Sequence, residues 1–95
     1  MKKIGFRAAL KKMGASEITM YSIYGNPEKE WSAFFIGNGG VFKENQLYYA
    51  HYNPNFSYGA NKVYFRTAKD RKDYTGGFNQ WGFENELKRI GFELK

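Results

Sequence analysis

The sequence contains no cysteine, two prolines and one histidine, and it has no long apolar run. The absence of cysteine excludes disulfides, thiolate metal sites and cysteine nucleophiles, so the fold must depend on its hydrophobic core or on self-association. Because nitrogen and carboxylate ligands do not occur together at workable spacing, we expect no metal site and no cofactor. No stretch approaches the roughly 20 apolar residues of a membrane-spanning helix, so we expect a soluble cytoplasmic protein that does not bind membranes.

A chain of 95 residues is long enough for one domain with one core, and we expect a single domain over residues 1–95. Fifteen Lys and Arg residues against nine Asp and Glu residues give a net charge of +6. This excess favours polyanionic partners, either nucleic acid or an acidic protein surface. The cations are concentrated near the start of the chain and in residues 62–72. Proteins that carry charge for solubility alone have a similar excess.

The two ends of the chain repeat one short pattern, in which residues 5–14 correspond to residues 82–91. In each copy the apolar residues are spaced i, i+4 and i+7, which predicts an amphipathic helix. The closing glycine suits the left-handed residue that ends a helix. We expect helices over about Gly5–Met13 and Trp81–Ile90. Their outward cations form a candidate basic face that consists of Lys11, Lys12, Lys88 and Arg89.

Between the two predicted helices, β-branched and aromatic residues alternate with turn signals, as is typical of antiparallel strands. Strands are predicted at residues 17–24, 31–36, from 41 onward, 62–67 and 92–94. The pair Gly39 and Gly40 predicts a tight hairpin. Whether residues 47–52 continue the third strand after a bulge or form a separate strand is left open.

These elements predict an α+β fold with the order αββββαβ. We expect a single antiparallel sheet of about four to five strands, with both helices packed on one face and the other face open.

Aromatic residues are abundant: eight tyrosines, nine phenylalanines and two tryptophans make up 20% of the chain. One small core cannot easily bury so many rings, so we expect some of them to be exposed. Rings beside cations are typical of surfaces that stack on single-stranded nucleic acid, and also of protein interaction hot spots. The candidate binding residues are Tyr48, Tyr49, Tyr52, Phe56, Tyr58, Lys62, Tyr64, Arg66, Lys69, Arg71 and Lys72.

The leading hypothesis is a nucleic-acid-binding protein. In this hypothesis a sheet face and the loop at residues 53–61 stack on bases, while residues 62–72 neutralise phosphates. The composition fits a second hypothesis equally well. This is a protein-binding inhibitor or adaptor, of the type that phages use against host defence, directed at an acidic or nucleic-acid-binding surface of a larger partner. A third interpretation is a homodimer that buries the tyrosines of the second sheet face.

His51 is the one histidine, and as a general base it would need an orienting partner, for which the sequence offers distant Glu44 or Asp73. A histidine that packs on a strand face is the simpler interpretation. The order of helix, antiparallel strands and helix resembles that of small toxin ribonucleases with a double-stranded-RNA-binding fold. That resemblance implies acid–base and cationic roles for His51, Tyr64, Arg66 and Lys69. It covers the order of elements and includes no catalytic motif, so we expect no enzymatic activity and no catalytic residue.

Overall fold

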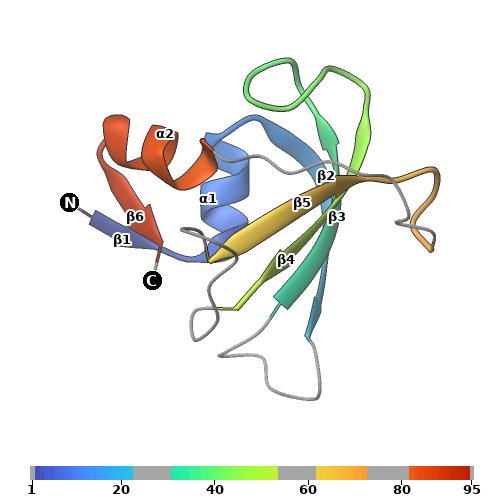
Figure 1. Cartoon of the computed structure of the whole chain (residues 1–95), viewed down its shortest axis with the longest axis horizontal. Coiled ribbons are helices and arrows are strands. Elements are labelled where there is room, and N and C mark those ends of the chain that lie inside the picture. Colours follow the sequence, from blue (N-terminus) through green and yellow to red (C-terminus); the bar gives the residue numbers. More distant parts are fainter. Residues whose placement is uncertain (1, 23–30, 54–61, 73–81, 95) are drawn as a thin grey trace.

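The computed structural model describes residues 2–22, 31–53, 62–72 and 82–94. In chain order its elements are β1 (Lys2–Ile4), α1 (Phe6–Lys12), β2 (Ala15–Ser22), β3 (Trp31–Gly37), β4 (Leu47–Tyr52), β5 (Val63–Thr67), α2 (Phe83–Arg89) and β6 (Phe92–Leu94). Figure 1 shows both helices to one side of the longer strands. The predicted α+β class is confirmed.

The strands form two sheets, so the prediction of a single sheet was wrong (Figure 1). β2, β3, β4 and β5 are consecutive neighbours in a four-stranded antiparallel sheet, whereas β6 pairs in parallel with β1. The predicted strand at residues 92–94 exists, but it lies outside the main sheet. β1 was not predicted because a three-residue strand with two lysines carries no strand pattern. Its partner lies at the other end of the chain.

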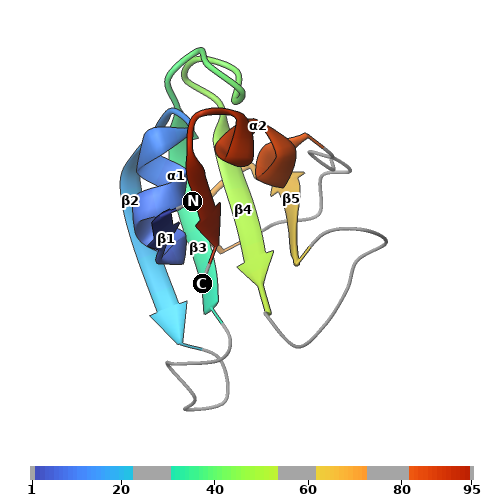
Figure 2. The ribbon, with the colours of Figure 1, turned by 90° about the vertical axis from the view of Figure 1, so that its left-hand side faces the viewer.

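Both helices pack on the same face of the four-stranded sheet, as predicted (Figure 2). Phe6 and Leu10 of α1 and Phe83 and Leu87 of α2 are at most 5% exposed. They belong to one apolar cluster with Phe65 and other sheet residues. Since neither helix is longer than seven residues, each is stabilised by this burial more than by its own backbone hydrogen bonds.

The two predicted glycine stops are confirmed. Gly14 and Gly91 both have φ of +99°, in the region that favours glycine. Their backbone N–H groups donate to the carbonyl oxygens of Lys11 (3.3 Å) and Lys88 (2.9 Å), respectively. The two helices therefore end in the same way, and each glycine leads directly into a strand.

The connection between β3 and β4 is a loop over residues 38–46, not the tight hairpin predicted at Gly39 and Gly40. Residues 47–52 form the separate strand β4. The loop passes so close to Gly37 that a Cβ atom there would collide with the carbonyl oxygen of Lys43. The close approach of loop and strand therefore requires a glycine at this position.

Phe42, predicted to begin a strand, instead turns from this loop into the core and is fully buried. Its ring centroid lies 4.7 Å from that of Phe35, 5.1 Å from that of Phe65 and 6.1 Å from that of Phe83. Phe42 thus joins the sheet to α2. A single ring in a glycine-rich segment gives no periodic signal, which is why the sequence did not predict this role.

Candidate nucleic-acid interface

The face of the four-stranded sheet away from the helices carries two rows of residues that cross all four strands in register. Each row crosses β2, β3, β4 and β5 in turn. Its residues lie on the same face because partners in register point to the same side of a sheet. We call the surface formed by these two rows the aromatic face. It consists of Thr19, Phe34, Tyr49 and Arg66 in one row and Tyr21, Ser32, His51 and Tyr64 in the other.

The rings of the aromatic face contact one another from β2 to β5. The centroid of Phe34 lies 6.1 Å from that of Tyr21 and 5.3 Å from that of Tyr49. The centroid of Tyr64 lies 6.3 Å from that of Tyr49 and 5.6 Å from that of His51, and its ring is stacked on the imidazole at 15°. Such contacts favour defined orientations of the rings.

The rings of this array differ in exposure. Phe34 and Tyr49 are 5% and 8% exposed, so they support the surface from within. Tyr21 on β2 is 44% exposed, and His51 and Tyr64 are partly exposed. A ligand would therefore meet Tyr21, His51 and Tyr64 rather than the two central rings.

Three exposed cations accompany the exposed rings. The Arg66 guanidinium lies 5.7 Å from the ring centroid of Tyr64, within cation–π distance. Lys69 and Lys72 are exposed in the segment after β5. Within the part of the chain that the structure describes, none of these three cations forms an ion pair. Their charge is available to an external anion.

Arg71 has a structural role that its sequence context did not reveal. The register of β2 against β3 shifts between Ser16 and Thr19, and Glu17 in this bulge has φ of +49°. A bulge interrupts the ladder of backbone hydrogen bonds. The Arg71 guanidinium donates to the carbonyl oxygens of Glu17 (3.0 Å) and Phe34 (3.2 Å) and to Thr19 Oγ1 (3.1 Å). Arg71 thus ties the segment after β5 to β2 and is engaged in the fold rather than presented to a phosphate.

Tyr48 and Tyr52 lie on the helix-covered face and are 3% and 5% exposed. Tyr52 stacks on Phe6 at 5.1 Å, and the Tyr48 hydroxyl accepts a hydrogen bond from the backbone N–H of Lys43 at 2.8 Å. Burial, and to a lesser extent the negative charge of Glu84, raises the pKa of Tyr52. Both tyrosines therefore belong to the core, although the sequence predicted them on an exposed binding surface. Adjacent residues of a strand point to opposite faces, so the alternation could have separated Tyr48 from Tyr49.

Lys62 lies beside α2 rather than with Arg66 on the aromatic face. Its backbone N–H donates to both carboxylate oxygens of Glu84, at 3.2 and 3.3 Å. It also lines a hollow of mixed charge with Glu84, Lys88, Glu93 and Leu94. The candidate residues Phe56 and Tyr58, and also Asp73, lie outside the described residues.

His51, Tyr64 and Arg66, three of the four residues of the ribonuclease hypothesis, are neighbours. Within the described ranges, no three His, Cys, Asp or Glu side chains are grouped so that they could hold a metal ion. Nor is either helix there long and apolar enough to cross a membrane.

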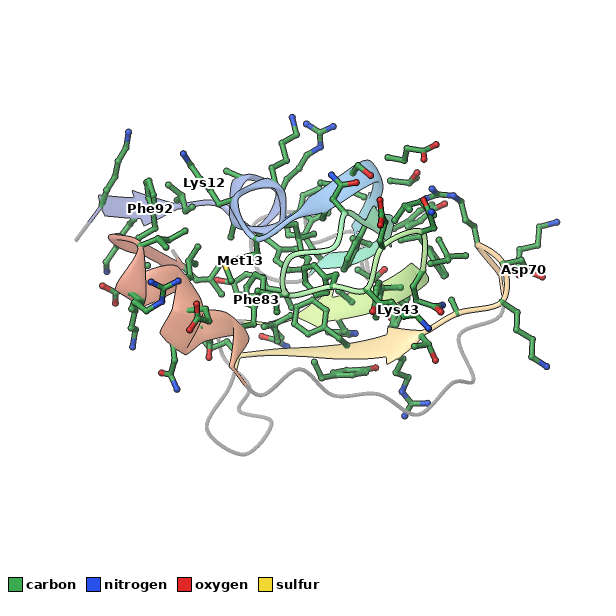
Figure 3. All side chains as sticks on the ribbon, turned by 90° about the horizontal axis from the view of Figure 1, so that it is seen from above. Lys12, Met13, Lys43, Asp70, Phe83 and Phe92 are labelled. Carbon is green, nitrogen blue, oxygen red and sulfur yellow. The ribbon has the colours of Figure 1, made fainter. Side chains whose placement is uncertain are left out.

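The candidate basic face of the helices is separate from the aromatic face. It carries Lys11, Lys12, Lys88 and Arg89. The Lys12 Nζ atom lies 4.6 Å from the ring centroid of Phe92, and Arg89 forms an ion pair with Glu86 at 2.9 Å. The hydrogen bond that Arg89 donates to Glu86, and then the negative charge of Glu86, raise the pKa of Arg89. Figure 3 shows Lys12 and Phe92 at one end of the molecule and Asp70 at the other.

Comparisons with protein-family models, with curated proteins and with solved structures give no match.

Proposed function

We propose that the protein binds single-stranded nucleic acid on the aromatic face. The observation that carries this proposal is the stack of His51 on Tyr64, with the Arg66 guanidinium beside the same tyrosine. Partly exposed rings next to unpaired cations are the combination that single-strand-binding surfaces use. The contacts among the rings hold these groups in place, so little ordering is required when a ligand binds.

Each part of the surface has a defined role in this proposal. Tyr21, His51 and Tyr64 offer partly exposed ring faces or edges to unpaired bases, and a stacked base contributes about 1 to 3 kcal/mol. Arg66, Lys69 and Lys72 neutralise phosphates. Three phosphate contacts predict that log K falls with log salt at a slope of about −2, taking roughly −0.7 per contact for a single strand.

The test is a titration of a fluorescent single-stranded oligonucleotide, monitored by anisotropy at several salt concentrations. Removal of a stacking ring in Tyr21→Ala should weaken binding by roughly 5- to 150-fold. Ile90→Ala is the matched control, because Ile90 on the other side of the protein is 40% exposed, close to the 44% of Tyr21. No binding at low salt, an affinity independent of salt, or an equal loss in both variants would contradict the proposal.

A protein-binding inhibitor or adaptor is the second candidate. The exposed Tyr21 and Arg66 are residue types that dominate protein interaction hot spots, which favours this candidate. A pull-down from nuclease-treated lysate, together with the oligonucleotide titration, distinguishes the two proposals. The second candidate would be supported if the parent protein captures one protein after nuclease treatment and Tyr21→Ala does not. The oligonucleotide titration would also have to show no binding.

The hypothesis of ribonuclease activity is tested by looking for cleavage of a single-stranded RNA oligonucleotide in the titration samples. If oligonucleotide cleavage occurs, His51→Ala should abolish it, and retained cleavage would remove His51 from the mechanism.

A further inference from the structure

A second cationic surface lies on the helix side of the molecule, at β1 and α1. Its members, here called the β1–α1 basic surface, are Lys2, Lys3, Arg7, Lys11 and Lys12. All five are exposed, and the first acidic residue of the chain is Glu17. Within the described ranges, none of the five forms an ion pair. Five cations within eleven consecutive positions, residues 2–12, make this a strongly positive part of the protein, in which Glu93 of β6 lies in register with Lys3.

The equivalent surface of α2 lacks this charge. The repeat aligns Arg7 with Glu84 and Lys11 with Lys88. α1 carries three cations and no acid, whereas α2 carries two cations and two acids, so the two seven-residue helices have net charges of +3 and 0. Because α2 forms an equivalent helix without the excess, the positive charge of α1 is not needed for the fold.

The chemistry of the β1–α1 basic surface favours phosphates and offers little to bases. Phe6, the aromatic residue of α1, is 5% exposed, and the nearby ring of Phe92 is partly buried beneath the Lys12 ammonium. Stacking platforms for unpaired bases require accessible rings. A nucleic-acid duplex, in contrast, keeps its bases stacked inside and presents a dense line of phosphates.

We infer that the β1–α1 basic surface binds the phosphate backbone of a nucleic-acid duplex, independently of sequence. The surface is on the helix side of the four-stranded sheet, and the aromatic face is on the other side. The inference therefore stands whether or not the aromatic face binds single strands. Because Lys2 and Lys3 are adjacent in β1 and point to opposite faces, four of the five cations can face one duplex. Four phosphate contacts predict a salt slope of about −3.6 on B-form DNA, taking roughly −0.9 per contact.

The test uses a blunt-ended duplex without single-stranded ends, titrated at several salt concentrations. Arg7→Gln combined with Lys11→Gln should make the slope shallower by about 1.8 and lower the affinity. The matched pair of single variants is Lys11→Gln and Lys88→Gln, which remove the same charge from exposed, equivalent positions of the two helices. Lys11→Gln should weaken duplex binding, and Lys88→Gln should leave it unchanged.

Three outcomes would overturn the inference. The first is equal weakening by Lys11→Gln and Lys88→Gln, which would show that net charge and not this surface matters. The second is loss of duplex binding in Tyr21→Ala, since that would place the duplex on the aromatic face. The third is binding of poly-glutamate as tightly as the duplex, because the partner would then be an acidic protein. Circular dichroism confirms that each variant is folded before it is titrated.

Discussion

The helix unit at the start of the described chain and the one near its end share their backbone but differ in surface chemistry. α1 and α2 bury equivalent Phe and Leu residues, and each ends at a glycine with φ of +99°. Their net charges nevertheless differ, at +3 and 0. The comparison shows that apolar spacing and the final glycine determine the helix, while the outward residues vary without changing it.

The two units also differ in the strand that each glycine leads into. After Gly14 the chain enters the eight-residue strand β2 of the main sheet, whereas after Gly91 it enters the three-residue strand β6, which pairs with β1. The same local ending therefore leads into two different sheets. Strand length and available partners decide the outcome, because a strand is stabilised by its neighbours rather than by itself.

The largest expected effect is loss of a buried leucine from either helix. Leu10 and Leu87 are equivalent in the repeat, and both are 0% exposed. Leu10→Ala and Leu87→Ala should each lower the free energy of unfolding by about 2 to 5 kcal/mol, because each leaves a cavity in the shared core. Urea denaturation measures both. If one variant loses less than about 1 kcal/mol of unfolding free energy, the two helices do not contribute equally to the core.

A smaller effect is expected at the two glycine stops. Gly14→Ala and Gly91→Ala should each cost about 1 to 2 kcal/mol, because an L side chain in the left-handed region is strained. An added Cβ would be 3.6 Å from the nearest atom at Gly14 and would meet nothing within 4 Å at Gly91, so strain rather than collision determines both losses.

Asparagine provides the control for the glycine stops, since it tolerates the left-handed region better than alanine. Gly91→Asn should therefore lose less stability than Gly91→Ala in thermal or urea denaturation. Equal losses would show that the positive φ is not the cause.

The smallest expected effect concerns Tyr52, which connects the two units. Its ring stacks on Phe6 of α1, and burial and then Glu84 of α2 raise its pKa. The unfolded tyrosine titrates near pH 10, so above about that pH the folded state retains a proton that the unfolded state has released. This contribution to stability is present below pH 10 and is lost as the pH rises toward the raised pKa of the folded state.

Urea denaturation between neutral and alkaline pH tests this linkage. Tyr52→Phe should remove part of the alkaline decline in stability, and Glu84→Gln should reduce it less, because the charge of Glu84 is the second cause of the shift. Lysine titration affects the parent and the variants alike and cancels in the difference. An identical alkaline decline in parent and Tyr52→Phe would show that this tyrosine does not link stability to pH.

The sequence predicted part of the aromatic face and did not include Tyr21, its most exposed ring, among the candidate residues. It identified Tyr49, Tyr64 and Arg66, which the sheet brings to one face. It did not separate them from Tyr48 and Tyr52, although the alternation along β4 places those two on the other face. Which of the two faces is buried depends on where the helices pack.

Arg71 illustrates what local patterns cannot predict. Its guanidinium binds a carbonyl oxygen 54 positions away, at a bulge that the sequence does not mark. The role of this cation therefore depends on the position of the bulge and not on the neighbouring cations in the chain.

The sequence by itself determined the α+β class, the two helices and their glycine stops, because these depend on residues within a few positions of one another. The tertiary structure alone decided the pairing of β1 with β6 and the burial of Phe42. It also placed the aromatic face and the β1–α1 basic surface on opposite sides of the sheet. These features depend on contacts between distant residues, and their free energy is gained when the whole core assembles.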